Sequence, residues 1–168
     1  ASRVVYVSSD KRGLAFKFQS LKYAYDDNAK EHKEYQEGMQ HWMIPKVFGY
    51  FTMEILEQKV SVLTVAKMSC SIQDIVQKRD YYPKQLQILV NAVVSSWRLL
   101  SRCIMETELH LGDWHLANLM LPLSDTSGNV VHLVDWSNSK KTCETSYQRA
   151  KGAKETLLNC LLYTSDAA

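Results

Sequence analysis

The sequence lacks several features that would point to a partner or a location. Its formal net charge is only +2 over 168 residues, without the concentrated basic face or run that a dedicated nucleic-acid or membrane partner requires. No apolar run approaches about 20 residues, so we expect no membrane-spanning helix. No signal peptide is visible at the start, and internal repeats and low-complexity segments are absent as well. We therefore expect partners that are neither nucleic acids nor membranes.

Cysteine is scarce and widely spaced. The chain has four cysteines, Cys70, Cys103, Cys143 and Cys160, and no two are close enough for a C-x-x-C metal or redox motif. A reducing, intracellular (cytoplasmic) setting fits this pattern best, with two disulfide bridges as the alternative. Cys103 lies within a helical pattern and is expected to be a small buried hydrophobic residue.

The composition that is present belongs to an ordinary globular protein. Hydrophobic residues make up 46% of the chain and charged residues 23%, which suffices for a stable core at this length. We expect a single domain or a compact two-lobed unit.

The first third of the chain predicts a small antiparallel sheet. β-branched and aromatic residues, alternation and turn clusters indicate four strands, over residues 3–8, 14–19, 46–53 and 59–66. Lys17 stands in the middle of the second strand, on the face that also carries Ala15 and Gln19. The ordinary alternative for such a residue is a solvent-facing strand lysine.

One helix is expected between the second and third strands. Residues 26–28 supply N-cap candidates for a helix over 28–42. Its apolar stripe would consist of Ala29, Tyr35, Met39 and Trp42. Glutamates occupy its first turns and are expected to be mostly solvated.

The rest of the chain predicts a connector followed by mainly helical structure. Residues 67–70 have no periodicity and indicate a short hinge, and a short helix then begins at the N-cap Ser71. The clearest helix spans 83–107, where apolar residues recur at spacings of four and three. These are Leu86, Val90, Val93, Trp97, Leu100 and Ile104. Apolar runs at 118–121 and 130–134 flank a turn cluster and indicate a hairpin.

Several motifs resemble those of the protein-kinase-like phosphotransferases, over about residues 2–136. Ala15-Phe16-Lys17 is similar to the A-x-K motif, which in that family lies on the third strand of the N-lobe. Ser2-Arg3-Val4 is similar to the tail of the family's glycine-rich loop. Gly112-Asp113-Trp114-His115-Leu116-Ala117-Asn118 is similar to the catalytic loop D-x-x-x-x-N, and Asp135-Trp136-Ser137 stands where the family carries D-F-G. Residues 71–74 resemble the start of the helix after the hinge.

This resemblance implies an α+β, two-lobed, protein-kinase-like fold. Its N-lobe, a small antiparallel sheet with one helix, would span residues 1–66, with the hinge at 67–70 and a partial helical C-lobe over 71–168. The front of the glycine-rich loop is missing, and no A-P-E motif follows Ser137; residues 144–162 could form one further helix. We therefore expect a chain that is truncated at both ends.

The implied activity is transfer of the γ-phosphate of ATP to a hydroxyl group, with Mg²⁺. Phosphoryl transfer needs positioning and charge neutralisation more than covalent help, and Mg²⁺ prefers oxygen ligands. The resemblance implies catalytic roles for Asp113, Asn118 and Lys17, and metal ligation by Asn118 and Asp135. It implies ATP contacts for Val4, Ala15, Lys17, Glu34, Val65, Ala66, Lys67 and Met68. Glu34 is favoured over Glu31 and Glu37 as the partner of Lys17, from its spacing to the following strand.

The acceptor stays open between proteins and small molecules. His110 lies three residues before Asp113, where the protein-kinase H-R-D pattern needs two, and His115 stands where lysine is usual. Gly112-Asp113 with His115, and Asp135-Trp136, resemble the aminoglycoside and choline phosphotransferases, whereas the upstream half resembles protein kinases.

Two other functions are alternatives. A metal-dependent hydrolase would place Zn²⁺ or Mn²⁺ among imidazoles and carboxylates, here His110, Asp113, His115, His132 and Asp135. A non-catalytic kinase-like module would keep the fold and bind a partner.

Overall fold

The structure is a computed structural model that describes residues 3–10, 13–22, 25–37, 42–78, 83–106 and 115–135, together with the backbone of 109–110 and 140–141 and four helical residues, Gln148, Lys151, Lys154 and Glu155. The chain forms two compact units, Ala1–Met68 and Ser69–Ala168. Their boundary falls within the segment 67–70 that the sequence indicated as a hinge. The mixed α+β class with a small antiparallel sheet is confirmed.

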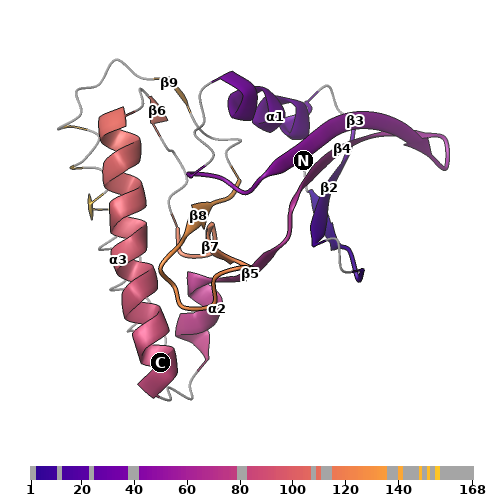
Figure 1. Ribbon diagram of the computed structural model, residues 1–168. Coiled ribbons are helices and arrows are strands. Elements are labelled where there is room, and N and C mark those ends of the chain that lie inside the picture. Colours follow the sequence, from indigo (N-terminus) through magenta and orange to yellow (C-terminus); the bar gives the residue numbers. More distant parts are fainter. Residues whose placement is uncertain are drawn as a thin grey trace. The chain divides into compact units, whose positions relative to one another are not determined.

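The first unit is built on a four-stranded antiparallel sheet in the order β1-β2-β4-β3. The strands are β1 (Val4–Val7), β2 (Leu14–Ser20), β3 (Val47–Ile55) and β4 (Gln58–Ala66). β3 and β4 continue as a long curved hairpin beyond the rest of the sheet (Figure 1). Leu56 and Glu57 form its turn, and both have positive φ angles, 47° and 60°. Hairpin turns with two such residues match the right-handed twist of the strands.

Helix α1 (Asp27–Glu37) is held to this sheet mainly through polar groups. The Ala29 N–H donates to Asp26 Oδ1 at 3.0 Å, as expected at a helix N-terminus. The same carboxylate accepts hydrogen bonds from Ser61 on β4 (2.8 Å) and from Tyr50 on β3 (2.6 Å). Burial, together with the neighbouring Asp26, raises the pKa of Tyr50 to about 12, so this phenol stays a donor at ordinary pH.

A second set of bonds joins the first turn of α1 to β2. The Gln19 side chain accepts from the Asp27 N–H at 2.8 Å, and the Asn28 amide donates to the Lys17 carbonyl at 2.8 Å. Gln19 and Asn28 are both fully buried. Of the predicted apolar stripe, Tyr35 is buried as expected, but the other buried positions on the helix are the polar Asn28 and Glu31. Met39 lies outside the described residues. The helix also ends before the predicted residue 42, since Trp42 lies in a turn.

The second unit contains two helices and short strands. The predicted connector is in part a strand, β5 (Met68–Ser71), which joins β7 (Leu119–Pro122) and β8 (His132–Leu133) in one sheet. Helix α2 (Ile72–Gln77) begins at the predicted N-cap Ser71, whose hydroxyl accepts from the Asp74 N–H at 3.0 Å. This reciprocal capping lowers the pKa of the Asp74 carboxyl. β6 (Leu109–His110) pairs with β9 (Lys140–Lys141).

Helix α3 (Pro83–Glu106) spans almost the predicted range, but its predicted apolar stripe is confirmed only in part. Leu100 and Ile104 of that stripe are buried, whereas Leu86, Val90 and Trp97 are exposed. The other buried residues are Ala92, Ser95, Ser96, Leu99 and Cys103. The small residues Ala92 and Ser95 lie where the turn between β7 and β8 approaches the helix closely. Cys103 is buried as predicted, and burial raises the pKa of its thiol to about 12.

Helix α3 also bears on the expectation that no segment is suited to cross a membrane. By length and composition alone it qualifies as such a span, a test that the core helix of a soluble protein also passes. The expectation therefore stays a prediction, because this criterion does not distinguish a core helix from a membrane span.

Gly128 fixes the β7–β8 turn against α3. Its φ is +82°, and a Cβ atom at this position would lie 2.5 Å from the Ile88 carbonyl oxygen and 3.0 Å from the Ala92 nitrogen. Hydrogen bonds support the contact: the Ser95 hydroxyl donates to the Asn129 carbonyl and the Asn91 amide to the Ser127 carbonyl, both at 2.9 Å. The turn is thus held by backbone-to-backbone approach.

We predict that Gly128→Ala lowers the free energy of unfolding by roughly 2–5 kcal/mol, because it combines a positive φ with overpacking against helix backbone. Denaturant unfolding followed by circular dichroism measures this change. Gly49→Ala is the matched control, since a Cβ atom added there would meet no other atom within 4 Å, and it should change stability by less than about 1 kcal/mol. Equal losses in the two variants would contradict the proposed contact.

Candidate functional site

Lys17 is buried and ion-paired in the middle of β2. It is only 9% exposed, and its ammonium donates to Glu31 Oε1 on α1 at 2.6 Å. The solvent-facing alternative for this lysine is therefore wrong. Antiparallel pairing sets Lys17 opposite Val5 on β1 and Leu63 on β4, so it lies on an inner strand. The strand alternation and the helix above it place this charge inside the unit.

Glu31 gathers three donors around one carboxylate that is fully buried. Arg3 and Lys17 form ion pairs with it, one on each oxygen, and the Tyr35 hydroxyl donates to the oxygen that also accepts from Lys17. Asn28, Glu31 and Tyr35 lie on one face of α1, at helical spacing. The polar anchors of the first turn fix this face towards the sheet, and so they fix Glu31 over Lys17.

Glu34 is not the partner of Lys17. It is half-buried, whereas Glu31 is fully buried and in contact with the ammonium. Glu34 was favoured from its spacing to the following strand, and this spacing does not determine which turn of the helix faces β2. Arg3 and Tyr35 were not predicted as members of this cluster. The signal for Tyr35 was its helical spacing from Asn28 and Glu31. These polar residues occupy the face of the helix where an apolar stripe was expected.

The sheet register separates two residues that the sequence assigned to one nucleotide site. Val4 pairs with Phe18, whereas Ala15 pairs with Val7 and Lys17 with Val5. Directly opposed residues share a face of the sheet, so Val4 lies on the face opposite to Ala15 and Lys17. Val5 and Val7 take its expected place beside them. The prediction that Val4 and Ala15 contact the same nucleotide base is therefore wrong, because the two residues lie on opposite faces of the sheet.

The segment Val65–Met68 leads out of β4 to the boundary between the units. Val65 is buried opposite Ala15. The Ala66 N–H donates to the Lys46 carbonyl and the Lys67 N–H to the Gly13 carbonyl, both at 2.7 Å. These two backbone donors are therefore already engaged within the unit. Met68 is half-buried at the start of β5.

In the second unit, the β7–β8 hairpin brings Asn118 and Asp135 to the same end of two paired strands. Leu119 pairs with Leu133, and the Val134 N–H donates to the Asn118 carbonyl at 2.9 Å. Asp135 follows directly. Asn118 is buried, and its own N–H donates to the His115 carbonyl at 2.9 Å. Two oxygen-bearing side chains thus start from adjacent backbone positions, although they are far apart in sequence.

Asp135 has a strained backbone. Its φ is +61°, a left-handed conformation that few non-glycine residues adopt. Such strain costs about 1–3 kcal/mol and is concentrated at functional sites. It occurs here at the residue that the sequence singled out as the main metal ligand.

Asp113, the predicted catalytic base, lies outside the described residues. The ends of its loop are nevertheless tied down: His110 precedes it in β6, which pairs with β9, and Asn118 follows it in contact with β8. The Gln73 N–H at the start of α2 donates to the Leu116 carbonyl at 3.3 Å. The described residues on either side of Asp113 therefore pair with elements of the same unit.

The part of the chain that the structure describes contains no group of three or more His, Cys, Asp or Glu residues arranged to hold a metal ion. His115, His132 and Asp135 are all described, so these three do not form such a group. Asn118 and Asp135 are the residues that fit Mg²⁺, which takes one or two protein oxygens and completes its shell with phosphate oxygens and water. A scan against protein-family models and a search of curated proteins found no match for this chain.

We predict that Glu31→Gln lowers the free energy of unfolding by about 3 kcal/mol, because it leaves Lys17 and Arg3 buried without their carboxylate. Chemical denaturation at neutral pH measures the loss. Glu34→Gln is the matched control on the same helix and should change stability by about 0.5 kcal/mol or less. A larger loss in Glu34→Gln than in Glu31→Gln would overturn the assignment of Glu31.

Proposed function

We propose that this chain carries an ATP-dependent phosphotransferase site of the protein-kinase-like class, which moves the γ-phosphate to a hydroxyl group. The observation that carries the proposal is the buried ion pair between Lys17 and Glu31. In protein kinases, a glutamate on a helix forms an ion pair with a lysine on a strand of the N-lobe sheet, and this lysine neutralises nucleotide phosphates. A buried ion pair between a lysine and a carboxylate contributes little net stability, because the desolvation of both charges offsets their attraction. Stability therefore does not by itself explain this pair.

The arrangement of elements supports a protein-kinase-like two-lobed fold. The first unit has an antiparallel sheet with one helix, and the second begins with a capped short helix, followed by a long helix and a hairpin. In this proposal the two units are the N-lobe and the C-lobe, and 67–70 serves as the hinge. An ATP-dependent enzyme of this kind fits the intracellular setting that the cysteine pattern favoured.

Each unit supplies a different part of the chemistry. Lys17 neutralises the phosphates of ATP, with Ala15 and Val65 on the same sheet face to contact the nucleotide. Asp135 and Asn118 hold Mg²⁺ through one carboxylate and one neutral oxygen, which balances the metal charge without excess negative charge. Asp113 accepts a hydrogen bond from the substrate hydroxyl and orients it for in-line attack.

The acceptor is a hydroxyl-bearing protein or small molecule. His115, two residues after Asp113, and Trp136, after Asp135, favour the small-molecule class by resemblance to the aminoglycoside and choline phosphotransferases, whereas the A-x-K hairpin favours protein kinases. A non-catalytic module is less favoured, since the chain keeps Lys17, Asp113, Asn118 and Asp135. The hydrolase is less favoured because His115, His132 and Asp135 form no three-residue group.

We predict that Lys17→Met weakens Mg-ATP binding at least tenfold, because the β- and γ-phosphates lose their cation. Isothermal titration calorimetry of the chain with Mg-ATP measures the affinity, after circular dichroism has shown that the variant is folded. The control is Lys59→Met, an exposed lysine of β4. If Lys17→Met and the parent chain bind Mg-ATP with equal affinity, Lys17 does not contact the phosphates and the proposal loses its main support.

We predict a clear division of effects between two aspartates. Asp135→Asn should abolish the Mg²⁺ dependence of nucleotide binding, whereas Asp113→Asn should leave binding intact and reduce turnover by about 10²–10⁴. Titrations with and without Mg²⁺, and ATP turnover in the presence of hydroxyl acceptors, separate the two. Full activity in both variants would refute the assignment.

A further inference from the structure

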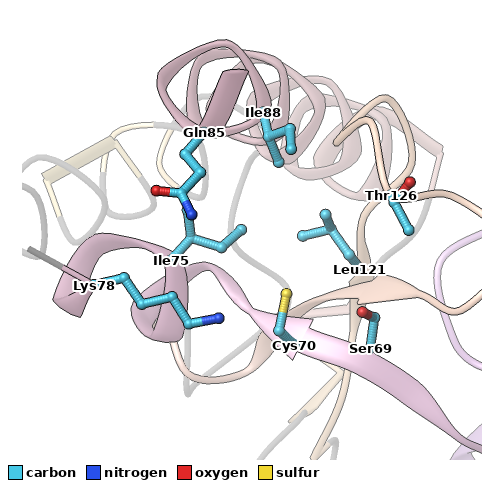
Figure 2. A pocket seen from close by; sticks show the side chains of 8 residues that line it. All are labelled: Ser69, Cys70, Ile75, Lys78, Gln85, Ile88, Leu121 and Thr126. Atoms are coloured by element: carbon cyan, nitrogen blue, oxygen red, sulfur yellow. The ribbon is translucent and has the colours of Figure 1, made fainter. Parts of the chain in front are cut away.

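A cavity of about 150 Å³ lies in the second unit, at the meeting of β5, α2, α3 and β7 (Figure 2). Its walls include Cys70, Ile75, Lys78, Gln85, Ile88 and Leu121. None of these residues has a part in the proposed phosphotransferase chemistry. An engineered protein cavity of about this size binds benzene, so the volume fits a single small ring.

The floor of the cavity is apolar. Leu121 and Ile75 are buried, and Ile88 on α3 is half-buried. Such a surface favours the body of an aromatic or short aliphatic molecule, because apolar area leaves water when the ligand enters.

Polar side chains line the cavity on two sides of this floor, with Lys78 and Gln85 on one side and Ser69 and Thr126 on the other (Figure 2). Figure 2 shows the side chains of Lys78 and Gln85 on the same side of the cavity, with Ile75 between them. Lys78 is the only charged residue among those that line the cavity, and its side chain is exposed to solvent. It forms no ion pair with any described residue, but its charge adds to the hydrogen bonds from Ser71 in lowering the pKa of the Asp74 carboxyl. Asp74, one turn earlier on α2, uses its carboxylate to cap Ser71, at 2.7–2.8 Å.

The Gln85 amide oxygen is buried and has no hydrogen-bond partner among the described residues, and in Figure 2 the amide nitrogen is the atom on the side of Ile75. Leaving a buried polar atom unsatisfied costs about 1–3 kcal/mol, so such atoms in native proteins usually meet water or a ligand. A half-turn of the amide exchanges its oxygen for an N–H donor, and side-chain amides are interchangeable in this way. Gln85 can therefore offer a donor to an anionic group as readily as an acceptor.

We propose that this cavity is a binding site for a small carboxylate with an apolar ring or short chain. The carboxylate pairs with the Lys78 ammonium and accepts a hydrogen bond from the Gln85 amide. The apolar part lies on Ile75, Ile88 and Leu121, and it covers the thiol of Cys70. Lys17, Asn118 and Asp135 are not among the residues that line this cavity, so the proposal can be tested independently of the proposed phosphotransferase activity.

Cys70 provides a reporter for the test. Its thiol is unbridged and half-buried at the wall of the cavity, whereas Cys103 is fully buried. Sodium benzoate is the probe, and benzyl alcohol, a neutral ring of similar size, is its match. The chain is treated with iodoacetamide over a range of probe concentrations, and the alkylation rate of the Cys70 peptide is measured by mass spectrometry.

We expect benzoate to slow the alkylation of Cys70, with half-saturation on the order of 1 mM, and benzyl alcohol to require at least tenfold more. Lys78→Gln should raise the half-saturating benzoate concentration at least tenfold. Lys84→Gln, which removes an exposed lysine that does not line the cavity, should leave it unchanged. Ile88→Phe should fill the cavity and make the Cys70 rate independent of benzoate.

Three outcomes would overturn the proposal. The first is a Cys70 rate that benzoate does not change in the parent chain. The second is equal protection by benzoate and benzyl alcohol, which would show that the charge of Lys78 is not used. The third is an equal loss in Lys78→Gln and Lys84→Gln, which would reduce the effect to general electrostatics.

Discussion

The buried carboxylate of Glu31 is the constraint on which the first unit depends. It is fully removed from solvent and must satisfy two cations and a phenol. Burying such a group costs several kcal/mol of desolvation, and an apolar cluster of equal volume would often be as stable or more so. Stability alone is therefore a weak explanation for this carboxylate, and the role proposed for Lys17 in phosphate binding would explain it. The polar anchors of α1 serve this purpose, since they set the turn of the helix that faces β2.

In the second unit, the candidate residues depend on a close contact between backbones rather than on buried charges. Gly128 allows the β7–β8 turn to meet α3, and the hairpin then sets Asn118 next to Val134 and Asp135. Asn118 and Asp135 therefore directly flank two paired strands, a placement that suits a preorganised site.

Prediction from the sequence succeeded where local patterns decide the outcome. The strands around Lys17, the N-cap at Ser71 and the long helix α3 all lie close to their predicted ranges, because alternation, capping and helical period are local properties. The face of a helix is harder to predict. The predicted stripe of α3 is correct at Leu100 and Ile104 but wrong at Leu86, Val90 and Trp97, which are exposed. Near Gly128 the helix buries the small Ala92, because the turn approaches its backbone closely there.

The sequence by itself determined the class of elements, the placement of Ala15 and Lys17 on one face of a strand, and the candidates Asn118 and Asp135. Only the tertiary structure decided that Glu31 rather than Glu34 meets Lys17, that Arg3 and Tyr35 join them, and that Val4 lies on the other face. These outcomes depend on register and on the rotation of α1 about its axis. Both are set by contacts between residues far apart in the chain, such as Asp26 with Ser61 and Tyr50, which no local pattern encodes.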